Sequence, residues 1–83
     1  PNPFIIPDKQ GAIIKNIPSG ARLKIITISG KLIKDIQLDS NQSQYIWDGT
    51  NIYGESVGTA IYIISTFKTD EPNKVAKIAV IRK

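Results

Sequence analysis

The sequence predicts an all-β domain of the sandwich type. Isoleucine is its most frequent apolar residue, and β-branched side chains favour strands over helices. Short apolar runs recur about every 8–12 residues with turn-forming residues between them, the spacing typical of a β-sandwich. No segment has the 3.6-residue period of an amphipathic helix. A chain of 83 residues has room for one domain only.

The first elements are short. Residues 1 to 7 contain three prolines, so we expect an extended lead-in or an edge strand, anchored by Phe4, Ile5 or Ile6. Residues 11 to 17 follow as a short strand. It ends at a turn over residues 18 to 20, where Gly20 permits a positive φ.

A hairpin is predicted next, from residues 21–28 and 31–38. In its first strand apolar Leu23 and Ile25 alternate with Arg22 and Lys24, a period of two. The break at residues 29–30 supplies the turn.

Three further strands complete the set. Residues 44–48 form a short strand after a polar loop, and residues 74–82 form the last strand after a hairpin loop over residues 69–73. Between them, residues 60–68 are apolar almost without interruption. Such a strand lies centrally and is covered either on both faces or by a neighbouring domain on one.

The composition argues against catalysis. The chain has neither His nor Cys, which excludes the usual zinc sites and the Ser-His-Asp and Cys-His mechanisms. Its acidic residues lie in turns or beside lysines, so paired carboxylates facing a cleft are not expected. We therefore predict a protein that is not an enzyme and that has no cofactor.

Basic residues outnumber acidic ones, which gives a net charge of +4. An anionic partner would fit this balance, but basic residues spread along the whole chain favour an ordinary solubilising surface. Nucleic-acid binding needs a basic stripe interleaved with exposed aromatics, which the pattern does not show. Only the tail is locally basic, through Lys74, Lys77, Arg82 and Lys83.

The ends of the chain indicate a fragment. The sequence starts at Pro1 and contains no Met, so we expect a piece of a longer polypeptide. No window reaches the ~18–20 apolar residues that span a bilayer, and we predict no membrane span.

Two polar or aromatic groupings invite a binding site. Asp48, Thr50 and Asn51 offer close oxygen atoms, yet their spacing does not fit a calcium loop, and a turn with Asp48 as cap and Gly49 and Gly54 in tight geometry is favoured.

Trp47 and the tyrosines could instead form a sugar-binding platform. A core role is favoured for Trp47. Tyr62 is expected in the core or at a corner, with its hydroxyl bonded to backbone. Tyr53 is expected to be the most exposed of the aromatics.

Several stretches in order resemble a known family. They are Pro1-Asn2-Pro3-Phe4, residues 23–33, residues 45–51 with Gly54, Val57 and Ala60-Ile61-Tyr62, and residues 77–83. This order resembles the C-terminal domain of type A that directs cargo to the type IX secretion system, and the related immunoglobulin-like domain of flagellar hook-capping proteins. The resemblance covers nearly the whole chain.

The resemblance implies an immunoglobulin-like antiparallel β-sandwich of about seven strands over residues 1–83, at the C-terminus of an exported protein. Such a domain passes through the periplasm of a Gram-negative bacterium and is read by the outer-membrane secretion translocon. A sortase-type peptidase then removes it from most cargo, and the body is attached to anionic lipopolysaccharide at the cell surface. The signal motifs map to Ala60, Ile61, Tyr62, Lys77, Ile78, Val80, Arg82 and Lys83. A few components of the machinery keep the domain permanently.

The end of the last strand offers an independent reason to expect docking. A final strand can form a sheet edge whose unpaired backbone groups accept a partner strand. Arg82 and Lys83 would favour an acidic or phosphate-bearing surface there. An ordinary final strand whose lysines discourage aggregation remains the alternative.

Overall fold

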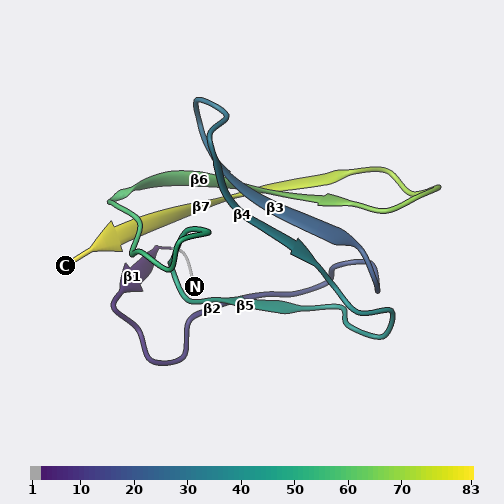
Figure 1. Cartoon of the computed structure of the whole chain (residues 1–83), viewed down its shortest axis with the longest axis horizontal. Coiled ribbons are helices and arrows are strands. Elements are labelled where there is room, and N and C mark those ends of the chain that lie inside the picture. Colours follow the sequence, from purple (N-terminus) through teal and green to yellow (C-terminus); the bar gives the residue numbers. More distant parts are fainter. Residues whose placement is uncertain (1–2) are drawn as a thin grey trace.

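Seven strands form two facing sheets in the computed structural model, which describes residues 3–83 (Figure 1). The larger sheet has the order β1-β7-β6-β3-β4, and the smaller sheet pairs β2 with β5. No helix occurs among residues 3–83. The predicted all-β sandwich of about seven strands is confirmed. The strands are β1 (Phe4–Ile6), β2 (Ala12–Ile14), β3 (Arg22–Thr27), β4 (Leu32–Gln37), β5 (Tyr45–Trp47), β6 (Ala60–Phe67) and β7 (Lys74–Arg82).

Strand positions follow the predictions closely, with one informative difference. The strand predicted over residues 11–17 is only three residues long, because Asn16 takes a left-handed conformation with φ 60° and turns the chain away from β5. Asparagine is among the few residues that tolerate this conformation. Ile17 is then buried as a loop residue, and its N–H donates to the carbonyl oxygen of Ser43 at 3.0 Å.

The core lies between the two sheets and follows the period-two pattern. Leu23 and Ile25 of β3 are fully buried, whereas Arg22 on the same strand is exposed. In β6 the inward face carries Tyr62 and Ile64. Alternation along the strand therefore places the apolar side chains on one face, as expected for half-buried strands.

Three aromatic rings tie the layers together. The centroid of Trp47 lies 5.9 Å from that of Phe4 and 5.7 Å from that of Tyr62. Trp47 and Phe4 are fully buried, so β1, β5 and β6 share one aromatic cluster. Tilted and edge-on arrangements of this kind contribute beyond the area that they bury.

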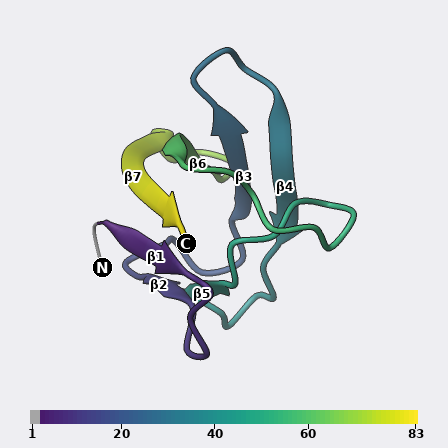
Figure 2. The same cartoon turned by 90° about the vertical axis from the view of Figure 1, so that its left-hand side faces the viewer.

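Strand β1 is the edge strand anticipated from the proline-rich start, but it pairs with β7 in parallel. The register places Phe4 opposite Val80 and Ile6 opposite Arg82. A wholly antiparallel sandwich is thus wrong for this one pair. Pro1 and Asn2, which open the predicted lead-in, lie outside the described residues. Figure 2 shows β1 beside the end of β7, on the side nearest to β2 and β5.

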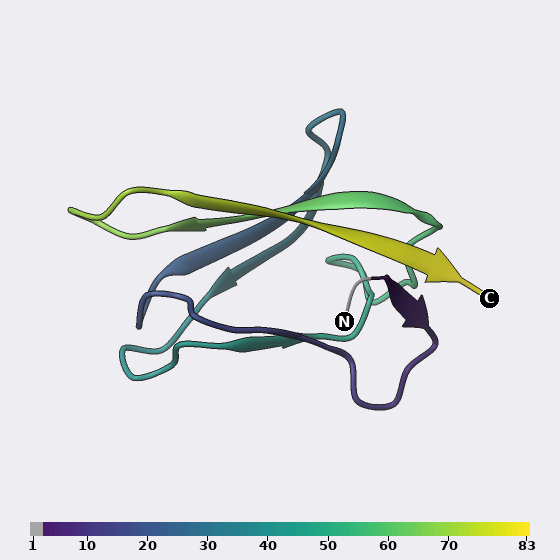
Figure 3. The ribbon, with the colours of Figure 1, turned by 180° about the vertical axis from the view of Figure 1, so that it is seen from behind.

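The prediction for β6 was half correct. The strand is central, since it pairs with β3 on one side and β7 on the other. Covering on both faces is wrong within residues 3–83, because the outward residues Ile61 and Ile63 are exposed and half-buried. The outer face of the larger sheet faces away from the β2–β5 sheet in Figures 1 and 3. A neighbouring domain on this face remains a prediction.

Candidate recognition surface

The pairing of β6 with β7 brings the two predicted signal segments together. Ala60 lies opposite Val80 and Tyr62 lies opposite Ile78 across the antiparallel ladder. Segments more than a dozen residues apart in sequence therefore form one patch of a single sheet.

The predicted recognition residues divide into two faces. Tyr62, Ile78 and Val80 point into the core and are nearly inaccessible. The accessible residues of the predicted set are Ala60, Ile61, Lys77, Arg82 and Lys83. In the folded domain the first group supports the sheet, and only the second group is available for contact with a partner.

A hydrogen bond holds the Tyr62 side chain against the segment that precedes β6. Its hydroxyl donates to the carbonyl oxygen of Gly58 at 2.7 Å, four residues upstream. Burial raises the pKa of the Tyr62 hydroxyl. The arrangement has the geometry of the tyrosine corner of immunoglobulin-like domains, and the predicted core or corner role is confirmed.

An apolar strip crosses the outer face beside the accessible signal residues. We call Ile5, Ile61, Ile63 and Ile81 the outer patch. Ile5 and Ile81 are opposite one another in the β1–β7 ladder, and Ile61 lies on β6 two residues before Ile63. Ile61 is 45% exposed and Ile5 is 43% exposed. Exposed apolar side chains that are grouped in this way are more informative than single ones, because contiguous apolar patches mark interaction sites.

Positive charge borders this patch. Lys77 lies on the same face, opposite Ile63 across the ladder. Arg82 and Lys83 follow Ile81 at the end of β7, where Arg82 is exposed although it pairs with inward-facing Ile6. Among residues 3–83, none of these three basic side chains takes part in an ion pair. The patch therefore combines exposed apolar area with unneutralised positive charge.

The sequence singled out Lys77, Arg82 and Lys83 but missed Ile5 and Ile81. Ile5 comes from the other end of the chain, and only the parallel β1–β7 pairing places it beside Ile81. Alternation along the strands gave a signal that could have found them, since Ile5 lies between buried Phe4 and Ile6, and Ile81 follows buried Val80.

The end of β7 is held on both sides. β6 flanks it through Ala60, and β1 flanks it from Val80 to Arg82. The Arg82 N–H donates to Thr59 Oγ1, and the Lys83 N–H donates to the Ile6 carbonyl oxygen, both at 2.9 Å. The expectation that the last strand is a sheet edge is therefore wrong for Val80–Arg82, which β1 covers, but no strand among residues 3–83 covers Lys74–Lys77 on that side.

The Asp48 turn is built from its own hydrogen bonds. The Asp48 carboxylate accepts bonds from the Thr50 N–H and hydroxyl. The hydrogen bond from the Thr50 hydroxyl is the main cause that lowers the pKa of Asp48. The predicted cap by Asp48 is confirmed.

Asn51 organises the second half of the same loop. Its side-chain oxygen accepts the N–H groups of Tyr53 and Glu55 at 2.9 and 3.0 Å, and its amide donates to the Glu55 carboxylate. Gly54 has φ 79°, as the tight turn requires. The oxygen atoms that suggested a calcium site thus bond within the loop, and Lys34 Nζ of β4 donates to Thr50 Oγ1 and to the Asn51 carbonyl oxygen, each at 3.2 Å. In residues 3–83, no three His, Cys, Asp or Glu side chains are grouped as a metal site would need.

The aromatic residues do not form a platform. Trp47 is fully buried, and its indole N–H donates to the Thr50 carbonyl oxygen at 2.9 Å. Tyr53 is 79% exposed, as predicted, but it stands in the loop while Trp47 and Tyr62 face the core. The core role predicted for Trp47 is confirmed.

Comparison with known proteins finds similarity in structure. No family model matches the sequence, and no curated protein matches it. The fold is similar to part of PorZ, described as an essential bacterial surface component of the type-IX secretion system of the human oral bacterium Porphyromonas gingivalis. The superposition has a TM-score of 0.82 and 23% sequence identity over 99% of this chain.

The match covers nearly all of this chain but only a small part of PorZ. The chain spans 11% of the PorZ chain, so the comparison concerns a single domain of a much longer protein. It supports the immunoglobulin-like fold expected from the sequence. No helix among the described residues is long and apolar enough to cross a membrane.

Proposed function

We propose that this domain is a non-catalytic recognition domain of the type IX secretion system, carried at the C-terminus of an exported protein. The observation that supports it most is the structural match to PorZ along almost the whole chain. The resemblance of the ordered sequence motifs to the C-terminal sorting domain of type A supports the same system.

The proposed contact surface is the outer patch with its basic border. An apolar strip beside unpaired lysine and arginine side chains suits a partner with an apolar centre and acidic or phosphate-bearing edges. The proposed partners are the outer-membrane translocon, the sortase-type machinery and anionic lipopolysaccharide. The proposed route leads through the periplasm to the cell surface of a Gram-negative bacterium.

Surface substitutions test this role better than removal of the tail. Deleting residues 78–83 would also remove Ile78 and Val80 from the core, so a loss of export could reflect unfolding. The triple variant Ile61→Ser, Arg82→Glu and Lys83→Glu changes accessible side chains only.

The variant should be expressed within its complete exported protein in a bacterium that has the type IX system. Cell fractionation is expected to show the variant retained in the periplasm and the unaltered protein at the surface. A matched control, Lys9→Glu with Lys31→Glu, changes exposed lysines outside the patch and should reach the surface. Normal surface display of a correctly folded triple variant would contradict the proposal.

A second candidate is a module that stays in the mature protein as part of the machinery. PorZ is itself a surface component of the system, which favours this alternative. Mass spectrometry of the surface protein separates the two. A mature C-terminus at Lys83 indicates a retained module, and one upstream of this domain indicates removed cargo signal.

A carbohydrate-binding module was the weaker alternative. It requires exposed aromatic faces, and burial of Trp47 and Tyr62 removes the residues that would supply them. Binding to a glycan panel that is lost in Tyr53→Ala would restore this alternative.

A further inference from the structure

Strand β7 is covered unevenly along its length. β6 pairs with it from Lys74 to Val80, but β1 pairs with it only from Val80 to Arg82. Among residues 3–83, no strand pairs with Lys74–Lys77 on the side away from β6, and we call these residues the open edge. Every second residue of such an edge directs its N–H and C=O groups toward solvent.

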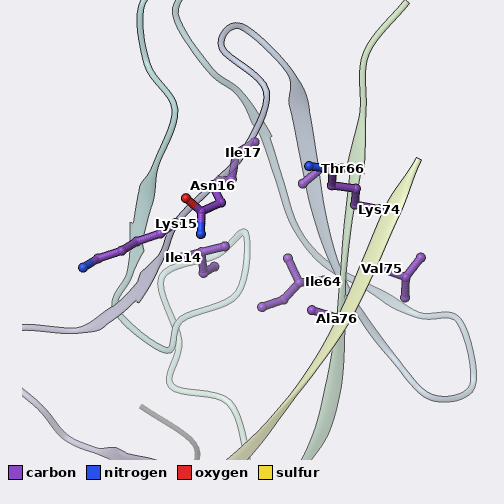
Figure 4. A pocket seen from close by; sticks show the side chains of 9 residues that line it. All are labelled: Ile14, Lys15, Asn16, Ile17, Ile64, Thr66, Lys74, Val75 and Ala76. Carbon is purple, nitrogen blue, oxygen red and sulfur yellow. The ribbon is translucent and has the colours of Figure 1, made fainter. Parts of the chain in front are cut away.

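A cavity lies directly behind the open edge. Its volume is about 280 Å³, and Ile14 and Ile17 line one wall while Ile64 and Ala76 line the other. Figure 4 shows Ile14 and Asn16 facing Ile64 and Ala76 across it. An apolar cavity of about 150 Å³ holds a benzene molecule, so this space accommodates one large or two small apolar side chains.

The register shows how a strand would use this space. Lys74 and Ala76 are on the inward face with Thr66 and Ile64, while Val75 and Lys77 face outward. Ala76 is nonetheless exposed, because the sandwich is not closed on this side, and Val75 is 66% exposed. A strand added here would place one side chain over Ala76 in the cavity and the next against Val75.

The lysines around the open edge favour a partner strand with acidic side chains. Lys15 and Lys74 both line the cavity, Lys77 ends the open edge, and none of the three makes an ion pair within residues 3–83. A second copy paired through the same edge would bring lysines against lysines, which is unfavourable. Acidic side chains would neutralise them.

We propose that the open edge is a strand-addition site for an extended segment of a partner protein with the pattern acidic, apolar, apolar, acidic. The acidic residues pair with Lys74 and Lys77, and the apolar residues cover Val75 and enter the cavity over Ala76. The pattern is symmetric, so it fits a parallel or an antiparallel strand. This site is on the opposite half of β7 from the outer patch's Ile81, shares Lys77 with the basic border of that patch, and does not depend on the proposed export role.

The probe is the capped hexapeptide SEVVES, added to the isotope-labelled chain and followed by NMR. Chemical-shift changes are expected in the amides of Lys74–Lys77 and in the methyl groups of Ile14 and Ile64. The capped peptide SKVVKS and a SEVVES analogue with N-methylated valines should each bind at least about tenfold more weakly, because one repels the lysines and the other lacks the main-chain donors.

Two variants locate the site. Lys74→Glu with Lys77→Glu should weaken SEVVES binding about tenfold at low salt, whereas Lys9→Glu with Lys31→Glu should not. Ala76→Phe should abolish binding by filling the cavity, and a melting temperature close to that of the unaltered protein would establish that the variant is folded. If Ala76→Phe does not fold, the double lysine variant alone decides the outcome.

Three results would overturn the proposal. The first is no shift at millimolar SEVVES, and the second is equal binding of SEVVES and SKVVKS. The third is a concentration-dependent dimer, seen by sedimentation, that occupies the same edge and is not displaced by SEVVES.

Discussion

The two halves of β7 differ in what covers them, although the strand is continuous. From Val80 to Arg82 the strand lies between β6 and β1, and Val80 is 1% exposed. From Lys74 to Lys77 the strand has, among the described residues 3–83, a neighbouring strand on one side only, and Val75 is 66% exposed. Two valines on the same strand therefore lie in opposite environments.

The difference arises from the length of β1. Its three residues reach only the end of β7, and the chain then leaves through Pro7 toward β2. The terminal half is closed by Phe4 and Ile6, which pair with Val80 and Arg82, and the first half is left with an open edge beside a cavity. Residues Val80–Arg82 therefore stabilise the fold, whereas residues Lys74–Lys77 are available to a partner.

The largest expected effect on stability comes from removing the aromatic ring on which β1, beside the covered half of β7, packs. Trp47→Ala removes the ring that packs on Phe4 and Tyr62, and it should cost about 3–5 kcal/mol of unfolding free energy. A domain of this length has about 4–12 kcal/mol in total, so the variant should be largely or wholly unfolded in mild urea. Urea denaturation measures this, with the exposed Tyr53→Ala as a control that should change stability by less than about 0.5 kcal/mol. Equal stability of the two variants would contradict a stabilising role for the aromatic cluster of Phe4, Trp47 and Tyr62.

A glycine pair tests how tightly β1 is seated. A Cβ atom at Gly49 would lie 2.9 Å from Ile6 Cγ2 and 3.3 Å from Phe4 Cε2, in a backbone with φ +81°. Gly49→Ala should therefore destabilise by about 3 kcal/mol, from left-handed strain and crowding of β1 together. Gly54→Ala has the same kind of φ but open space around it, and it should cost about 1 kcal/mol. If thermal denaturation shows that the two variants lose similar amounts of stability, β1 shifts to accommodate the methyl group at position 49 and is not tightly packed there.

The valine pair compares the two halves directly. Val80→Ala removes buried methyl groups and should cost about 2 kcal/mol. Val75→Ala should change the unfolding free energy by less than about 0.5 kcal/mol, because its side chain is already in contact with water. Chemical denaturation of both variants checks this, and a large loss in Val75→Ala would mean that the open edge is covered in solution.

The smallest expected effect is on acid stability. The hydrogen bond from the Thr50 hydroxyl lowers the pKa of Asp48 below its ordinary value of 3.8 in the folded state. The carboxylate therefore contributes stability above that value, and the contribution is lost as pH falls through the lowered pKa. Asp48→Asn should lose less stability than the unaltered protein between pH 5 and pH 2, by about a few tenths of a kcal/mol for so exposed a group. Urea denaturation at each pH measures this, and an identical dependence of unfolding free energy on pH in the two proteins would contradict a role for the Asp48 carboxylate.

Local sequence predicted most of the strands because alternation acts over a few residues. Leu23, Ile25, Ile78 and Val80 are buried as the period-two pattern requires, and the last strand has the predicted bounds. The Asp48 cap and the Tyr62 hydroxyl bond were also predicted correctly. Each depends on atoms within four residues along the chain.

Long-range pairing was predicted less well. Nothing local shows that β1 runs parallel to β7 or that it covers Val80–Arg82, so the sequence did not show which part of the last strand is an edge. The apolar run of β6 likewise did not reveal that its outer face is exposed within residues 3–83. Apolarity records which residues favour burial, and it does not show whether a covering layer is present.

The sequence by itself determined the class of the fold and the absence of His and Cys chemistry, since composition and period-two alternation act locally. Only the tertiary structure decided which residues a partner can reach. It buried Tyr62, Ile78 and Val80, and it paired Ile5 with Ile81 from the other end of the chain. Within residues 3–83, it left Lys74–Lys77 with a strand on one side only. The physical reason is that accessibility of a strand depends on which other strand lies beside it, and that is fixed by register between segments far apart in the chain.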